Sequence, residues 1–148
     1  MKITRKQAAA SLLGLAASAA AQTPASKKHK VVMEMSLAGV DAWKHAVGHI
    51  GVLRNAFKED VQIEMVCLGE GLAVLQKTDT ELQAQLMKHA EAGVTFAACQ
   101  NSMRSRKVTT QDLFPFAAEV PSGIGEVVLK QEAGYSYLKM SYDEPLKA

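Results

Sequence analysis

Short apolar runs typical of β-strands alternate along the chain with segments that have the periodicity of α-helices, and no other feature constrains the fold as much. Five runs predict strands, at residues 31–35, 61–68, 94–99, within 114–120, and at 135–140. Helical segments between successive strands act as crossover connections, which keep the strands parallel. We therefore predict one α/β domain, a three-layer sandwich with a mainly parallel sheet of about five strands that is covered by helices on both faces.

Three long segments between these strands carry the main predicted helices. The first begins at Asp41, a residue type that favours the N-cap position, and keeps an apolar face through Phe57. The second spans residues 78–92 and ends at Gly93, as helices often end at a glycine. The third starts at residues 121–123 and is expected to direct three apolar residues toward the sheet, namely Ile124, Val127 and Val128.

The first 21 residues have the layout of a secretory signal peptide. Basic residues precede an uncharged stretch at residues 8–21, which has leucines at its centre and small residues at its end. The stretch is too short and too rich in alanine to span a bilayer, for which about 20 strongly apolar residues are needed. We therefore expect no membrane span and an exported, periplasmic protein. We expect a signal peptide at residues 1–21, a linker at 22–29, the folded α/β domain at 30–140 and a loose tail at 141–148.

Removal of this segment changes the charge of the chain. The full sequence has 17 basic and 15 acidic residues, and the first 21 residues hold Lys2, Arg5 and Lys6 but no acidic residue. The formal charge is +2 for the full chain and −1 for the remaining 127 residues. Only 5% of all residues are aromatic. A domain with neither a basic excess nor stacking side chains gives no reason to expect nucleic acid or an anionic membrane surface as a partner.

Cys99 is the strongest candidate for chemistry. In open α/β sheets, ligands bind beyond the carboxyl ends of the strands. Cys99 is the last residue of a predicted strand, directly before a turn into a helix, so its thiol can point into such a crevice. Amides at a nearby helix N-terminus would stabilise the thiolate. A free cysteine can equally serve as a small apolar residue that packs in the core, and the sequence leaves both interpretations open.

Other polar or small residues are predicted at the same edge of the sheet, where they would line the rim of a crevice. Glu70 stands between two glycines and is either an acid or base beside the thiol or a solvated loop residue. The full set of rim or substrate-binding candidates is Ser36, Glu70, Gln100, Asn101, Ser102, Ser122 and Gly123.

The second cysteine, Cys67, lies within an apolar strand and is expected to have a packing role. If its strand is next to that of Cys99, the two residues come near each other. A disulfide would still need Cα atoms within about 7 Å, so the sequence leaves this pairing open.

Two histidines, His45 and His49, are four residues apart and share one face of the first predicted helix. The glutamate of a His-Glu-x-x-His motif is missing, and no cysteine or carboxylate cluster has zinc spacing. We therefore expect a surface pair, with no metal site and no cofactor.

Four segments resemble the DsrE/DsrF-like family of sulfur-relay proteins. In chain order they are residues 66–72 (VCLGEGL), 94–103 (VTFAACQNSM), 120–126 (VPSGIGE) and 131–139, which ends in GYSYLK. The resemblance extends over nearly the whole predicted domain. It implies a three-layer α/β fold, assembly into small homo-oligomers such as trimers or hexamers, and a cysteine at the place of Cys99. In sulfur-relay members that cysteine carries a persulfide and works with sulfur donor and acceptor proteins.

Two functions follow for Cys99. In the first, the chain is a sulfurtransferase-like carrier that holds sulfur on Cys99 as a persulfide. In the alternative, it is a non-catalytic, oligomeric module that binds a small molecule or a partner, and Cys99 is structural. Export would separate this chain from the characterised relay members, which are cytoplasmic, and an oxidising compartment makes a persulfide harder to sustain.

Overall fold

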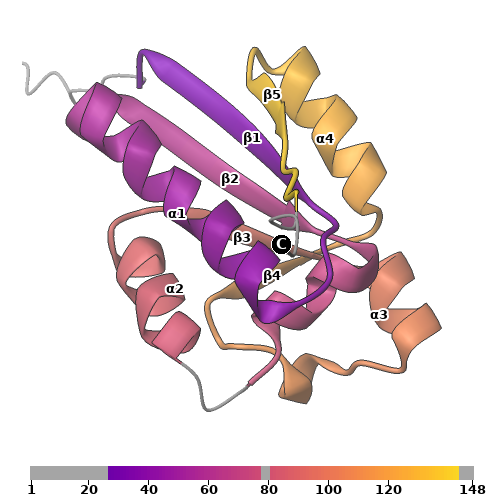
Figure 1. Ribbon diagram of the computed structural model, residues 1–148. Coiled ribbons are helices and arrows are strands. Elements are labelled where there is room, and N and C mark those ends of the chain that lie inside the picture. The colour runs from indigo at the N-terminus through magenta and orange to yellow at the C-terminus, as the bar shows by residue number, and fades with distance from the viewer. Residues whose placement is uncertain (1–26, 78–80, 144–148) are drawn as a thin grey trace, which may run out of the picture.

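The computed structural model describes residues 27–77 and 81–143, so the predicted signal peptide lies outside the described residues. Within them, five strands form one sheet in the order β4-β3-β2-β1-β5 (Figure 1). Every neighbouring pair is parallel, which confirms the predicted α/β fold. The strands are β1 (His29–Met35), β2 (Val61–Cys67), β3 (Thr95–Cys99), β4 (Ala117–Val120) and β5 (Ser136–Lys139).

The helices occupy the predicted segments, with some different ends. They are α1 (Val40–Phe57), α2 (Glu81–Glu91), α3 (Gln100–Arg106) and α4 (Gly123–Glu132), with 3-10 turns η1 (Lys58–Asp60), η2 (Gly69–Leu75) and η3 (Thr110–Asp112). The prediction that Asp41 is an N-cap was wrong. Gly39 is the N-cap of α1 and adopts a φ of 91°, a conformation that glycine tolerates and aspartate does not favour. Asp41 instead lies in the first turn, where its charge suits the helix dipole.

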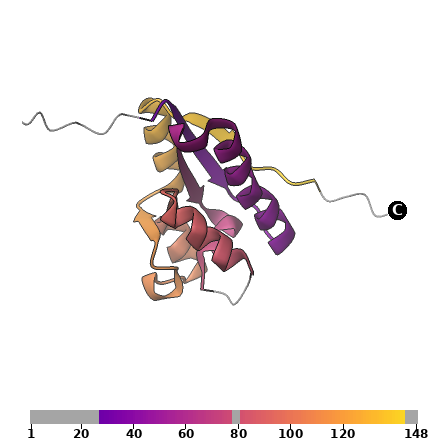
Figure 2. The same cartoon turned by 90° about the vertical axis from the view of Figure 1, so that its left-hand side faces the viewer.

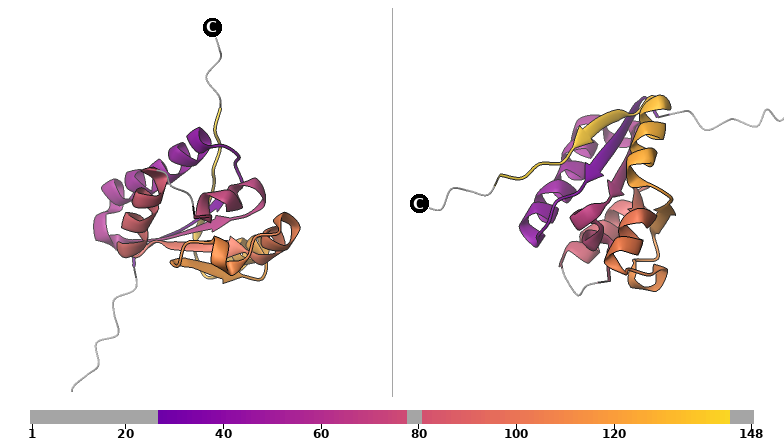
Figure 3. Two further views of the ribbon diagram at one scale, coloured as in Figure 1. Left: turned by 90° about the horizontal axis from the view of Figure 1, so that it is seen from below. Right: turned by 90° about the vertical axis from the view of Figure 1, so that its right-hand side faces the viewer.

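The direction of each crossover decides which face of the sheet a helix covers. The connections from β1 to β2 and from β2 to β3 step the same way across the sheet, and right-handed crossovers put α1 and α2 on one face. The connection from β4 to β5 runs back across the whole sheet, so α4 lies on the opposite face (Figures 2 and 3). The result is the predicted three-layer arrangement.

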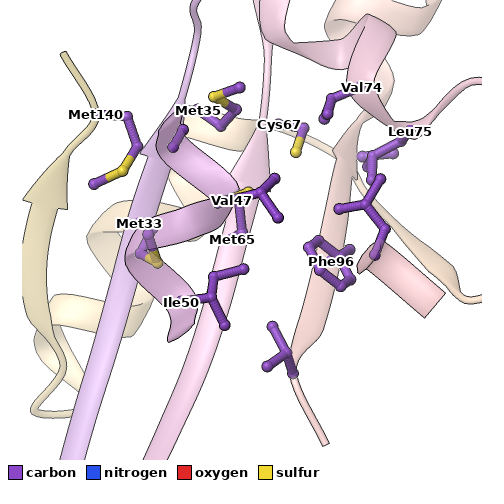
Figure 4. Packing of buried hydrophobic residues seen from close by; sticks show 14 of the residues in the cluster. Met33, Met35, Val47, Ile50, Met65, Cys67, Val74, Leu75, Phe96 and Met140 are labelled. Atoms are coloured by element: carbon purple, nitrogen blue, oxygen red, sulfur yellow. The ribbon is translucent and has the colours of Figure 1, made fainter. Parts of the chain in front are cut away.

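Alternating side chains of the strands supply two cores, one on each face. Met33, Met65 and Phe96 belong to the larger cluster, whose packing Figure 4 shows. Their neighbours in the strands, Val32, Val66 and Ala97, point to the opposite face of the sheet. With Val127 of α4 they form a smaller cluster.

The exposed side of α4 differs from the prediction. Val127 is buried, but Ile124 is 69% exposed and Val128 is 48% exposed, so the prediction that both point inward was wrong. On this face α4 meets the sheet along a narrow stripe that includes Gly123 and Val127. Apolar residues outside that stripe remain on the surface.

Nowhere in the described residues is there a helix with the length and apolar character that a membrane crossing requires.

Candidate functional site

Cys99 stands where three elements converge at the carboxyl edge of the sheet. It is the last residue of β3 and the N-cap of α3. It also pairs in register with Val120, the last residue of β4. Because α4 begins three residues after Val120, the parallel register brings the N-terminus of α4 beside Cys99. The residue is only 4% exposed.

The Cys99 sulfur accepts a hydrogen bond from the Gly123 N–H, which lies 3.1 Å from Sγ. Hydrogen bonding from the Ser102 hydroxyl and from the N–H groups of Ser102 and Asn101 also lowers the pKa of the thiol. Burial by itself raises the pKa of the Cys99 thiol, but these donors outweigh it and hold the pKa below its ordinary value. The site therefore favours the thiolate, the nucleophilic form of cysteine.

Gly123 can approach the thiol because it has no side chain. A Cβ at this position would lie 3.1 Å from the Cys99 Cβ and 3.2 Å from the Leu68 Cβ, both closer than ordinary contacts. The neighbouring Ser122 is the N-cap of α4, and its hydroxyl accepts a hydrogen bond of 3.2 Å from the Gly125 N–H. Ser122 and Gly123 thus hold the N-terminus of α4 against the Cys99 sulfur.

Ser102 connects the start of α3 to the loop that follows β2. Its Oγ accepts a hydrogen bond of 2.8 Å from the Gly69 N–H. The sequence placed Ser102 at the rim, but nothing in it revealed this link, because residues 69 and 102 meet only through the pairing of β2 with β3.

Three other rim candidates contact other side chains or follow a strand that is not next to that of Cys99. The Glu70 carboxylate forms an ion pair of 2.8 Å with Arg106. Gln100 donates a hydrogen bond of 3.0 Å to Glu119. Ser36 follows β1, which β2 separates from the strand of Cys99. The structure therefore brings Asn101, Ser102 and Gly123 to the thiol and gives the remaining candidates other partners or places.

Cys67 has an environment opposite to that of Cys99. It pairs in register with Ala98, so the two cysteines are one residue apart along neighbouring strands and point to opposite faces of the sheet. Both are free thiols. Cys67 is fully buried in the larger core (Figure 4), and this burial raises the pKa of its thiol. The neutral thiol is the stable form there.

The histidine pair lies on α1, away from the thiol. The rings of His45 and His49 are 4.7 Å apart, and the Nδ1 atom of His49 is 2.9 Å from the His45 carbonyl oxygen. Over residues 27–77 and 81–143, no three His, Cys, Asp or Glu side chains are grouped so that they could hold a metal ion.

A buried charge cluster beneath α4 was not predicted. Glu64 is 4% exposed, and its carboxylate lies 2.7 Å from the Lys130 amine, which is also 3.5 Å from Glu126. Burial raises the pKa of Glu64, and the neighbouring Lys130 opposes that shift. The pair ties α4 to β2. The one signal in the sequence is that apolar residues, Ile63 and Met65, flank this glutamate in the strand.

Comparison with known proteins identifies a family and solved structures with a similar fold. The sequence pattern of the DsrE/DsrF-like family matches residues 3–140. A protein of unknown function, MTH1491, from Methanobacterium thermoautotrophicum is 26% identical, with a TM-score of 0.70, over 75% of this chain and 98% of that chain. The ychN protein from E. coli is 13% identical, with a TM-score of 0.62 and the same coverage, and this likeness concerns the fold alone. No curated protein matches the chain.

Proposed function

Since the chain belongs to the DsrE/DsrF-like family, we propose that it is a sulfur carrier that holds one sulfane sulfur on Cys99 as a persulfide. The observation that carries this proposal is the hydrogen bond of 3.1 Å that the Gly123 N–H donates to the buried Cys99 sulfur. A stabilised thiolate at the edge of a parallel sheet is both a nucleophile and a leaving group, and a carrier needs both properties.

The chemistry consists of two thiol-exchange steps without any external oxidant or reductant. In loading, the Cys99 thiolate attacks the sulfane sulfur of a donor such as thiosulfate. A new S–S bond forms, the donor's S–S bond breaks, and sulfite leaves with the electron pair. In transfer, an acceptor thiolate attacks the outer sulfur of the persulfide. The Cys99 S–S bond then breaks, and its electron pair returns to Sγ, where the same donors stabilise the charge.

Intact-mass measurement tests this proposal. The protein is incubated with thiosulfate or polysulfide, freed of reagent and weighed, next to the Cys99→Ala variant and the Cys67→Ala variant as a matched control. We expect the wild-type protein and the Cys67→Ala variant to gain the mass of one sulfur atom or more. We expect no gain for the Cys99→Ala variant. Absence of the gain in wild type, or its persistence without Cys99, contradicts the carrier and favours a binding module.

We also propose that the chain forms homo-oligomers, trimers or hexamers, through the exposed side of α4. Three apolar residues lie there, and Ile124 and Leu129 are 69% and 60% exposed. A parallel sheet is normally covered on both faces, and a second copy would complete the cover that α4 leaves partial. Light scattering of the purified protein tests this, and the Leu129→Lys substitution is expected to lower the measured mass.

Finally, we propose that the protein is exported to the periplasm after cleavage of residues 1–21. The support is the signal-like pattern of the first 21 residues. Fractionation of cells that express the full chain, followed by intact-mass measurement, tests this. Full-length protein in the cytoplasmic fraction contradicts it.

A further inference from the structure

Helix α4 contacts the sheet through residues that share one side of the helix. Gly123, Val127 and Lys130 are spaced four and three residues apart, which places them on the same face. The Gly123 N–H lies 3.1 Å from the Cys99 sulfur, and the Lys130 amine lies 2.7 Å from the Glu64 carboxylate. Val127 packs between these two contacts. The two polar contacts therefore hold the helix at points about 10 Å apart along its axis.

The partners of these contacts lie on one face of the sheet, in the matching order. Because alternate residues of a strand share a face, Glu64 lies on the same face as Val66 in β2, and Cys99 lies on the same face as Ala97 in β3. Glu64 pairs in register with Thr95, four residues before Cys99. Helix α4 therefore runs back along the strands, from the thiol at its first residue to Glu64 at its last turn.

The apolar packing between the two polar contacts is limited. The cluster beneath α4 has one residue from the helix, Val127, and three from the strands, Val32, Val66 and Ala97. Hydrophobic burial is non-directional, so a cluster of this size holds the helix on the sheet without specifying which groups meet at its ends. An ion pair has defined partners, and its geometry sets the position of the helix along the strand.

The Glu64–Lys130 pair is a poor source of stability. Glu64 is 4% exposed, and its second oxygen, Oε1, is buried and accepts no hydrogen bond from the described residues. The cost of removing two charges from water can exceed their attraction, and an oxygen without a donor adds to that cost. Buried ion pairs of this kind are best known for fixing the register of packed elements. Position, rather than stability, is therefore the better account of this pair.

We infer that Glu64 and Lys130 are positioning residues, whose ion pair holds α4 where the Gly123 N–H reaches the Cys99 sulfur. The inference rests on the proposed function, in which Cys99 is the group that carries sulfur. Since Glu64 lies beside a residue four positions before Cys99, the pair acts through the helix rather than by contact with the thiol. Without the pair, the N-terminus of α4 moves from the sulfur and its hydrogen bond weakens.

The first experiment measures the rate of Cys99 alkylation by iodoacetamide against pH, in a Cys67→Ala background. The double substitution Glu64→Met with Lys130→Met replaces the pair by apolar side chains and leaves the net charge unchanged. We expect the pKa of Cys99 to rise by about 0.5–1 unit, which lowers the thiolate fraction near neutral pH about three- to tenfold. Lys130→Arg keeps an ion pair and should retain the wild-type profile. An unchanged pKa in the folded double variant overturns the inference.

Stability is measured on the same proteins by urea unfolding. The double variant should unfold at a urea concentration at or above that of Lys130→Met alone, because the single variant leaves the charge of Glu64 unpaired. If the double variant does not fold, Glu64→Gln with Lys130→Met takes its place, since glutamine keeps the shape of glutamate. A rise in the pKa of Cys99 in that pair supports the inference, and an unchanged value overturns it.

Glu126→Gln is the matched control. The Glu126 carboxylate lies 3.5 Å from the Lys130 amine, but both residues belong to α4, so this contact does not tie the helix to the sheet. We expect no rise in the pKa of Cys99, because the Glu64–Lys130 pair remains. A rise equal to that of the double variant would show that any change of charge on α4 affects the thiol, and it would overturn the positioning role.

The second experiment observes the Gly123 N–H directly, by amide hydrogen exchange measured with NMR. This amide is among the first four of α4, which have no partner within the helix, so its protection depends on the Cys99 sulfur. We expect exchange to be about tenfold faster in the double variant, as in Cys99→Ala. Unchanged protection overturns the inference.

The outcomes separate this inference from the proposed function. If wild type takes up no sulfur in the intact-mass measurement while the pKa of Cys99 and the exchange of Gly123 both change in the double variant, the positioning role is supported and the carrier function fails. If wild type takes up sulfur but neither property changes, the carrier function stands and the positioning role is overturned.

Discussion

The two cysteines end neighbouring strands at the same edge of the sheet, yet their surroundings give them opposite chemistry. Cys67 ends β2 and points into the larger core, where burial raises the pKa of its thiol. Cys99 ends β3 and points to the other face, where burial also opposes ionisation but four hydrogen-bond donors outweigh it. A strand end is therefore not sufficient for a reactive thiol. The face to which the residue points, and the helix N-termini that meet there, decide its protonation state.

The largest expected effect is on thiol reactivity. In native protein at neutral pH, we expect iodoacetamide to modify Cys99 at least about 100-fold faster than Cys67, because alkylation requires a thiolate and access to it. Time-resolved peptide mapping gives both rates. Unfolding in denaturant should remove most of the difference. Comparable rates in the folded protein would contradict the contrast between the two sites.

The next effect concerns the backbone donor from α4. Gly123→Ala forces α4 away from the sulfur, because a Cβ would lie 3.1 Å from the Cys99 Cβ. We expect the pKa of Cys99 to rise by about one unit and the free energy of unfolding to fall by about 1–3 kcal/mol. Gly48→Ala on α1 is the control, because its Cβ meets nothing within 4 Å. In that variant the free energy of unfolding should rise by about 0.5–1 kcal/mol, and the pKa of Cys99 should stay unchanged.

The smallest effect is a difference in how stability depends on pH. The pKa of Cys67 is raised by folding, so its thiol favours the folded state below the unfolded pKa of about 8.5 and loses this contribution as pH rises above it. The pKa of Cys99 is lowered by folding, so its contribution is present above about 8.5 and is lost as pH falls through the folded pKa.

Urea unfolding between pH 7 and 10 measures both contributions. Relative to wild type, Cys67→Ala should gain stability as pH rises, by about 1–2 kcal/mol at pH 10. Cys99→Ala should lose stability over the same range. Parallel slopes for the two variants would show that their environments do not differ as described.

The order of strands and helices was predictable from the sequence because it depends on local patterns. Apolar runs and helical periodicity are properties of consecutive residues, and Cys99 at the end of β3 follows from them. The exposure of Ile124 was not predictable in this way. An apolar residue points inward only if something covers it, and the number of helices on each face follows from the crossovers rather than from the periodicity of α4.

The hydrogen-bond donors around the Cys99 sulfur were predictable from the sequence only in part. Asn101 and Ser102 were placed near Cys99 because they follow it in sequence. The Gly123 contact requires the register that pairs Cys99 with Val120, and the Gly69–Ser102 bond requires β2 beside β3. Register and strand order are set by tertiary packing, so the sequence supplied candidates for these contacts but not the contacts themselves.

Direct titration of the Cys99 thiolate tests the central claim. In the Cys67→Ala variant, Cys99 is the one remaining cysteine, and the ultraviolet absorbance of its thiolate can be followed against pH in the folded protein. The arrangement of donors around Sγ predicts a pKa below the ordinary thiol value of about 8.5. A pKa at or above that value would contradict the claim that the fold prepares Cys99 as a thiolate.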